Sequence, residues 1–395
     1  MSDLSLPAPP RRSLSLHDTK VRGVFYQLLL ACGLLALAVG IGMQTASNMR
    51  VRGIPLSFAF WNDAAGFDIN QALIPYDELS TYGQAFWVGV ANTLYVSVLA
   101  ILFATLLGFF IGVARLSPNW IVSKVATAYV ELVRNVPLLL QLLFWYNAVL
   151  KPLPAPKASI AIPGGVYLNN RGLIIPEIQL HAGAGLVGLA FVAAVSCCIA
   201  FWLRAKSVQR RTGKQLPVFR VSLATLIGFP LIVFLAAGEP VSFVAPELRG
   251  FNFQGGHQLY PEFVALLIGL SVYTASYIGE IVRSGIQAVP KGQTEAAYAL
   301  GLAPGKTLRL VVIPQALRII IPPLTSQYLN LTKNSSLAVF IGYPDLVQIF
   351  AGTVLNQTGA AVQVMAITLS VYLMISIATS LAMNACNRHF AIVER

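Results

Sequence analysis

Charged residues are scarce in this sequence. Asp, Glu, Lys and Arg make up 11% of its 395 residues, whereas soluble domains carry about 25%. Hydrophobic residues reach 56%, and the mean hydropathy is +0.70. This composition excludes a soluble domain and predicts a protein embedded in a lipid bilayer. The net charge of +12 would suit nucleic-acid binding, but the positive residues cluster in alternate loops. That pattern reflects orientation in a membrane, so we expect no nucleic-acid partner.

Catalytic motifs are also missing. The chain has no Walker-type phosphate loop, no His-Glu-x-x-His motif and no Gly-x-Ser-x-Gly elbow. We therefore expect no catalytic residues, no metal site and no cofactor in this chain. The histidines are scattered, at His17, His181, His257 and His389. The cysteines lie in or beside apolar runs, and we expect them to be buried as small hydrophobic side chains: Cys32, Cys197, Cys198 and Cys386.

What the sequence has in abundance is long apolar runs. Eight of them approach the ~20 residues that cross ~30 Å of hydrocarbon. They are predicted at residues 24–43, 85–113, 127–150, 183–203, 220–238, 261–284, 315–341 and 363–386. The third must carry Glu131 and Arg134 in its first turns, because the uncharged stretch begins only after Arg134. The sequence thus predicts an all-α polytopic membrane protein with about eight transmembrane helices.

Lysine and arginine in short loops predict the orientation. The N-terminal tail, the loop at 204–220 and the loop at 283–318 are rich in both residues, and all three fall on one side. That side should be the cytoplasm. The opposite loops hold six positive and nine negative residues, and we count Asp345 among the negative ones. An even number of spans places both termini in the cytoplasm, and the first span is predicted to be an uncleaved anchor.

The polar segment at 290–318 is unusually long for a loop between two apolar runs. We expect Thr294 to cap a short helix with Glu295 in its first turn, where the helix dipole favours a carboxylate. Gly301 should end that helix in a left-handed conformation. A second helix is predicted to start at Ala303-Pro304, with proline in its first position. Two short helices joined at a glycine are typical of a docking element.

The same segment carries a family signature. Its pattern is Glu295-Ala296-Ala297, three residues, Gly301, nine residues, Val311, one residue and Ile313-Pro314. It resembles the cytoplasmic signature of bacterial ABC-type importer permeases, with Val311 and Ile313 in place of the usual Ile and Leu. The runs at 129–146, 299–302, 314–318 and 330–337 look like the polar amino-acid branch of these permeases. The runs at 60–76 and 80–89 look like the first membrane subunit of general L-amino-acid transport systems.

The resemblance implies a type I ABC importer permease core that moves L-amino acids by alternating access. It also implies that ATP and Mg are bound by a partner ATPase dimer. The other partners would be a homologous second permease subunit and a periplasmic amino-acid-binding protein, in a bacterial inner membrane. The coupling contact would involve Glu295, Ala296, Ala297, Gly301, Leu302 and Pro314. Two alternatives are an ion-coupled secondary amino-acid carrier and a membrane-bound structural or regulatory subunit.

Polar residues inside apolar spans are candidates for the translocation path. In the seventh span these are Gln327, Asn330, Lys333, Asn334 and Ser335, and in the third span Gln141. Lys333 could line an outer vestibule that receives carboxylates, or it could make a structural contact. The asparagines, serine and glutamine could equally join helices by hydrogen bonds. Glu131 with Arg134, and Glu280 with Arg283, are expected to form structural ion pairs three residues apart.

The resemblance also divides the chain. Residues 1–23 form a cytoplasmic tail, 24–88 a first transmembrane helix with a periplasmic segment, 89–389 the permease domain and 390–395 a second tail. The coupling loop is predicted at 285–318. Small members of this branch have five spans, so residues 151–262 are predicted to be an insertion that holds two extra helices. The simplest role for those helices is to widen the contact with lipid or with a partner.

Overall fold

The structure is a computed structural model, and it describes residues 19–51, 53, 57–214, 216–238 and 240–390. The tails predicted at 1–23 and 390–395 lie almost entirely outside the described residues. Among the described residues, seven helices are long and apolar enough to cross a membrane, and Leu138–Leu150 is a shorter apolar helix. The predicted all-α membrane region is therefore confirmed, and the predicted count of about eight spans is close to that observed.

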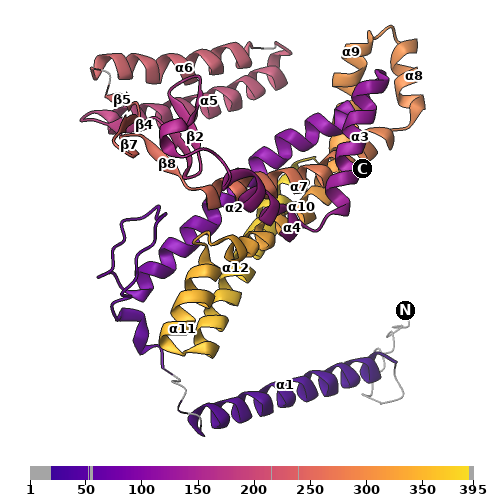
Figure 1. Cartoon of the computed structure of the whole chain (residues 1–395). Helices are drawn as coiled ribbons and strands as arrows, with labels where there is room; N and C mark the ends of the chain where they lie inside the picture. The colour runs from indigo at the N-terminus through magenta and orange to yellow at the C-terminus, as the bar shows by residue number, and fades with distance from the viewer. Residues whose placement is uncertain (1–18, 52, 54–56, 215, 239, 391–395) are drawn as a thin grey trace, which may run out of the picture.

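Five spans make a packed core (Figure 1). Four of them are α2 (Tyr82–Ala114), α7 (Pro261–Gln287), α10 (Ile313–Asn334) and α12 (Ala361–Phe390), and a broken span completes the set. Helices α2 and α7 form the largest contact. A β-carbon added to Gly108 would lie 2.5 Å from the Ile278 β-carbon, and one on Gly112 would lie 2.6 Å from that of Val282. Glycine at these positions lets the two helices approach closely, as is common between membrane helices.

The predicted third span is not one continuous helix. It consists of α3 (Trp120–Asn135), α4 (Leu138–Leu143) and a π-helix, η2 (Phe144–Leu150). Val136 between them is extended, as expected of a residue before proline. The Gln141 amide donates to the carbonyl oxygens of Val133 at 2.8 Å and of Val136 at 2.9 Å. Pro137 therefore breaks the predicted helix, and Gln141 satisfies the backbone at the break.

The first span is the isolated helix α1 (Thr19–Val51), which lies apart from the core in Figure 1. Its apolar side chains are exposed along most of its length, and Met49 near its end is buried. The four cysteines were expected to be buried, and this was wrong. Cys32, Cys197 and Cys386 are exposed, because each lies on a helix face that this chain does not cover, and Cys198 is half-buried against α6. In a bilayer such faces meet lipid or another subunit.

The insertion contains two helices and a set of strands. Helices α5 (Ala184–Thr212) and α6 (Val218–Ala236) occupy the predicted fourth and fifth spans and pack chiefly on each other. The strands were not predicted, because they are only three or four residues long. They are β1 (Ile160–Ile162), β2 (Val166–Asn169), β3 (Gly172–Ile175), β4 (Glu177–Leu180), β5 (Val241–Val244), β6 (Glu247–Arg249), β7 (Asn252–Gln254) and β8 (His257–Leu259). The order β1-β2-β3-β8 makes one antiparallel sheet, while β4-β5 and β6-β7 are separate pairs.

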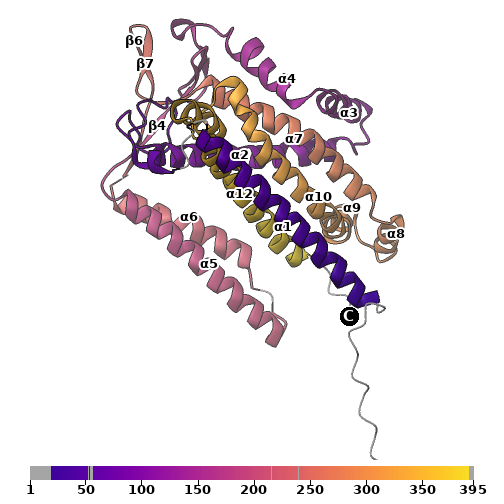
Figure 2. The same ribbon diagram turned by 90° about the horizontal axis from the view of Figure 1, so that it is seen from below.

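The strands stand at one end of α7, and two short helices stand at the other (Figures 1 and 2). Those two are α8 (Lys291–Ala299) and α9 (Pro304–Thr307), which lead through the π-helix η4 (Leu308–Val312) into α10. Beyond α10 the chain continues through η5 (Ser335–Ile341), the π-helix η6 (Val347–Val354) and α11 (Leu355–Thr358). Two single-turn helices, η1 (Ala59–Asn62) and η3 (Pro156–Ala158), lie near the strand end.

The segment before α2 is held by an apolar cluster at the strand end of the core. Phe60 and Ile69 are buried with Phe86 of α2 and Phe350 of η6. The rings of Phe86 and Phe350 are 5.3 Å apart between centroids. This cluster fixes residues 59–71 against η6, which places their polar side chains at the mouth of the core.

Candidate functional site

The α8–α9 segment projects at the end of α7 opposite the strands (Figure 2), and most of its residues are exposed. Glu295, Ala296 and Ala299 are exposed, whereas Ala297 is buried. Tyr298 is 50% exposed and Leu300 is 81% exposed. With Leu308 and Leu310, which are 48% and 62% exposed, these side chains make several large apolar groups on one polar segment, a candidate contact surface.

The geometry of this segment agrees with the sequence except at its start. Helix α8 begins at Lys291 after Pro290, and no side chain caps it. Thr294 is therefore not the N-cap, and Glu295 falls in the second turn. The helix starts about one turn earlier than predicted, directly after Pro290, which occupies the N-cap position with a ψ of 134°. The predicted start of α9 is confirmed, since Ala303 is extended and Pro304 is the first helical residue.

Gly301 ends α8 as predicted, with a φ of +76°. Its N–H donates to the Tyr298 carbonyl at 2.9 Å, and the Leu302 N–H donates to the Ala297 carbonyl at 3.1 Å. These two bonds form a Schellman motif, which satisfies the last carbonyls of the helix. The Gln315 side chain of α10 donates to that of Gln293 in α8 at 3.3 Å. Pro314, the remaining predicted coupling residue, is exposed in the first turn of α10.

The predicted path residues divide into two groups. Gln327, Asn330 and Asn334 line a cavity of about 240 Å³ between α7 and α10, together with Tyr273, Thr274, Tyr277 and Leu331. Lys333 is exposed and Ser335 is buried, and neither lines this cavity. The Ser335 hydroxyl donates to the Thr332 carbonyl at 2.8 Å, which is a local helix contact. Gln141 lies at the break in the third span, as described above, and is also absent from this cavity.

Two tyrosines in this cavity were missed by the sequence analysis. The hydroxyl groups of Tyr273 and Tyr277 lie 3.1 Å apart. The Arg134 guanidinium lies 4.8 Å from the centroid of the Tyr277 ring. A spacing of four residues on α7 places both tyrosines on one helix face, which the sequence could have indicated.

A cluster of charges joins α2, α7 and the neighbourhood of α3. Glu280 pairs with Arg283, as predicted, and also with Arg115 of α2. The Arg283 Nε donates to Glu280 at 3.1 Å. Glu131 and Arg134 were expected to pair, but they form no ion pair among the described residues. Arg134 instead lies over the Tyr277 ring. A cavity of about 470 Å³ lies between these groups, with lining from Arg115, Val130, Glu131, Arg134, Asn135, Tyr277 and Glu280.

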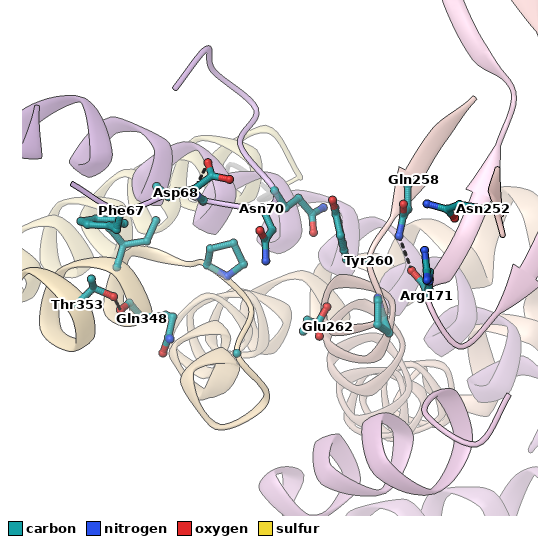
Figure 3. Close-up of a pocket in the computed structure, with 16 residues that line it drawn as sticks. Phe67, Asp68, Asn70, Arg171, Asn252, Gln258, Tyr260, Glu262, Gln348 and Thr353 are labelled. Carbon is teal, nitrogen blue, oxygen red and sulfur yellow. Dashed lines mark hydrogen bonds between the residues drawn. The ribbon is translucent and has the colours of Figure 1, made fainter. Parts of the chain in front are cut away.

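A larger cavity, of about 540 Å³, lies at the strand end of the core (Figure 3). Four regions line it: residues 67–71, the insertion, the start of α7 and residues 342–353. In the close-up, Arg171, Asn252 and Gln258 of the insertion lie on one side, and Asp68 and Gln348 lie on the other. Tyr260 and Glu262 lie between them.

Hydrogen bonds hold the walls of this outer cavity. The Gln258 amide donates to the Arg171 carbonyl at 2.8 Å, and the Tyr146 hydroxyl donates to Glu262 at 2.7 Å. The Arg171 guanidinium forms no ion pair among the described residues. The side-chain oxygen of Gln71 is buried there without a hydrogen-bond partner in the described part of the chain. A cationic group, carboxylates and an unsatisfied acceptor therefore face one space. This cavity cannot be predicted from the sequence, because its residues come from four distant segments.

Asp345, which the sequence places among the acids of the outer loops, does not face solvent. The side chain is fully buried between η5 and η6. One carboxylate oxygen accepts from the Gln348 N–H at 2.8 Å, and the other accepts from the Tyr372 hydroxyl at 3.1 Å. Burial raises the pKa of Asp345 to about 7, and these hydrogen bonds oppose that rise. The residue lies just before η6 and joins this region to α12.

Comparisons with known proteins agree with the signature in α8. Residues 216–391 match the family described as "Binding-protein-dependent transport system inner membrane component". The putative amino-acid ABC transporter permease protein YhdX of Escherichia coli K12 is 50% identical over 97% of this chain and 98% of its own length. The general L-amino acid transport system permease protein AapQ of Rhizobium johnstonii is 48% identical over 96% of this chain and 95% of its own.

A third relative and a solved structure are also similar. The glutamate/glutamine/aspartate/asparagine transport system permease protein BztB of Rhodobacter capsulatus is 41% identical over 98% of this chain and 97% of its own length. A crystal structure of an amino acid ABC transporter with histidines covers 78% of this chain and 95% of its own, with 22% identity and a TM-score of 0.47. The three sequence relatives thus extend over the insertion as well as the five-span core.

Proposed function

Because this chain belongs to the family of amino-acid ABC transporter permeases, we propose that it forms one half of a path for L-amino acids across a bacterial inner membrane. A homologous second permease subunit supplies the other half. A separate ATPase dimer binds ATP and Mg and drives transport. A periplasmic amino-acid-binding protein delivers the substrate to the strand end. Both termini of the chain face the cytoplasm.

The observation that carries this proposal is the exposed α8–α9 segment. Its nine-residue first helix has a length of about 14 Å, which suits a cleft on a partner surface. Tyr298 and Leu300 offer apolar contact, and Ala296 and Ala299 permit close approach. The bond between Gln293 and Gln315 connects this segment to α10, and the Schellman motif at Gly301 fixes the end of α8. Movement of the ATPase would therefore reach the helix that carries Gln327, Asn330 and Asn334.

The remaining cavities fit successive stages of alternating access. The outer cavity receives the amino acid, whose carboxylate pairs with Arg171 and whose ammonium group pairs with Asp68 or Glu262. The polar cavity on α7 and α10 forms part of the membrane path. The Arg115–Glu280–Arg283 cluster holds α2 to α7 near the cytoplasmic end. Such a cluster maintains the packing of the core while the coupling segment moves.

A charge placed on the exposed surface of the α8–α9 segment tests the proposal. Leu300→Glu buries a carboxylate in the contact with the ATPase, so we expect the purified permease to recover less than a tenth of the wild-type amount of ATPase subunits. Uptake of L-amino acids should fall in parallel, while the chain still inserts in the membrane. Leu79→Glu is the matched control, because Leu79 is 84% exposed at the opposite end. Normal ATPase recovery and uptake with Leu300→Glu would refute the proposed coupling contact.

A further inference from the structure

The α5–α6 hairpin carries two cavities that share Trp202, one apolar and one polar, and we call the two together the groove. The apolar part is a cavity of about 220 Å³ lined by Val195, Cys198, Ile199, Trp202 and Leu226. The polar part, of about 410 Å³, is lined by Trp202, Ala205, Lys206, Gln209, Leu216 and Val218. Trp202 belongs to both. The α5 residues recur at intervals of three or four, so they form one helix face that changes from apolar to polar along its length.

The polar end of this groove is strongly cationic. The stretch from Ala184 to Gly238 contains no acidic residue. Its cations gather at one end of the hairpin: Arg204, Lys206, Arg210, Arg211, Lys214 and Arg220. None of them forms an ion pair within the described part of the chain. The Lys206 ammonium lies 5.0 Å from the centroid of the Trp202 ring, which turns it toward the groove.

The cations stand at the depth of lipid headgroups. Ala184 to Leu203 is a run of uncharged residues, and twenty helical residues span about 30 Å, the thickness of the hydrocarbon layer. Arg204 and Lys206 follow at once, so they lie at the boundary between hydrocarbon and headgroups. The hairpin stands apart from the core in both views (Figures 1 and 2), and the residues that line the groove come from α5, α6 and the loop between them.

We propose that this groove binds one anionic phospholipid. Lys206 and Gln209 contact the phosphate, and the neighbouring arginines supply further positive charge. An acyl chain lies along Val195, Ile199 and Leu226, with Trp202 at the junction of headgroup and chain. The orientation of the hairpin in the membrane explains why cations gather at this end of it. It does not account for an apolar groove that continues the polar cavity on the same helix face.

Lipid binding to the purified transporter, with all its subunits, tests this site. Native mass spectrometry should show one tightly held dioleoyl phosphatidylglycerol and no comparable retention of dioleoyl phosphatidylcholine. Lys206→Gln should weaken binding about five-fold, since one cation near an anionic lipid contributes about 1 kcal/mol. Lys214→Gln removes the same charge from the same loop but lines neither cavity, so its effect should be less than two-fold. Equal effects of the two variants would reject a defined site in favour of diffuse attraction.

Two further arms separate a lipid from other ligands. Ile199→Trp fills the apolar cavity without changing the charge. It should weaken the binding of dioleoyl phosphatidylglycerol as strongly as Lys206→Gln does. Millimolar inorganic phosphate should not displace the lipid, and displacement would indicate a simple anion site instead. If Lys206→Gln lowered the recovery of ATPase subunits and left lipid binding unchanged, the hairpin would be a protein contact and the proposal would be wrong. This outcome is independent of the coupling test, because Leu300→Glu does not alter the groove.

Discussion

The α2–α7 pair and the α5–α6 hairpin are both built from apolar helices, yet they are packed in opposite ways. In α7 most side chains of the apolar stretch are buried within the chain, and glycines in α2 set its distance from α7. In α6 no side chain is buried. The first pair therefore packs throughout the core of this polypeptide, whereas the hairpin packs chiefly on itself and leaves its other faces to lipid or another subunit. Two helix pairs of similar hydropathy can thus form either a packed core or an exposed surface. The positions of small residues distinguish the two cases.

The largest expected effect comes from adding bulk to the core pair. Gly108→Val should destabilise the protein by about 3 kcal/mol or more, because its β-carbon meets the Ile278 side chain and the α7 backbone. Gly188→Val makes the same change in α5, where a β-carbon has no neighbour within 4 Å, and should be nearly neutral. Thermal unfolding of the purified variants gives the measurement. If both variants lost the same amount of stability, the proposed difference in packing between the core and the hairpin would be wrong.

A smaller effect, which depends on pH, is expected at the buried carboxyl group of Asp345. Its pKa is about 7 in the folded protein, against an ordinary value of 3.8, so the folded state holds a proton that the unfolded chain releases. The resulting stability is fully present below about pH 4 and is lost as the pH rises through 7. The total change is at most about 4 kcal/mol.

Asp345→Asn should remove this dependence, because the amide stays neutral while its oxygen can still accept from Gln348. Unfolding midpoints at pH 6 and pH 8.5 should then differ less than in the wild type. Glu78→Gln, a change at an exposed acid before α2, serves as control and should keep the wild-type difference. If Asp345→Asn kept the wild-type difference between the two unfolding midpoints, this carboxyl group would not titrate between pH 6 and pH 8.5.

The smallest effect is expected in the insertion, where an exposed arginine faces the outer cavity. Arg171→Gln should raise the apparent KM for amino-acid uptake about five-fold, in line with the loss of one exposed ionic contact. The maximal rate and the ATPase recovery should stay unchanged. Arg249→Gln is the control, because Arg249 is 67% exposed in the same insertion and lines no part of the cavity. If both variants had the same KM, the outer cavity would not take part in substrate binding.

The sequence predicted what depends on local chemistry. Apolar runs located the spans, and the residues around Gly301 located the end of α8 and the start of α9 correctly. It failed where proline competes with the hydropathy pattern, since Pro137 breaks the third span and Pro290 starts α8 one turn early. It could not give the β-strands, which are too short to show a period, or the outer cavity, whose walls meet only in the folded chain. Asp345 shows the same limit, because its burial depends on contacts with Tyr372, 27 residues away.

The central claim is that the α8–α9 segment transmits ATP hydrolysis to the membrane helices. Its most direct test is the ratio of L-amino acid taken up to ATP hydrolysed by the reconstituted transporter. Gly301→Val strains the turn at a φ of +76°, so the ratio should fall at least ten-fold while hydrolysis continues. Gly250→Val imposes the same kind of strain at a φ of +67° in the β6–β7 turn and should keep the wild-type ratio. An unchanged ratio with Gly301→Val would contradict this account.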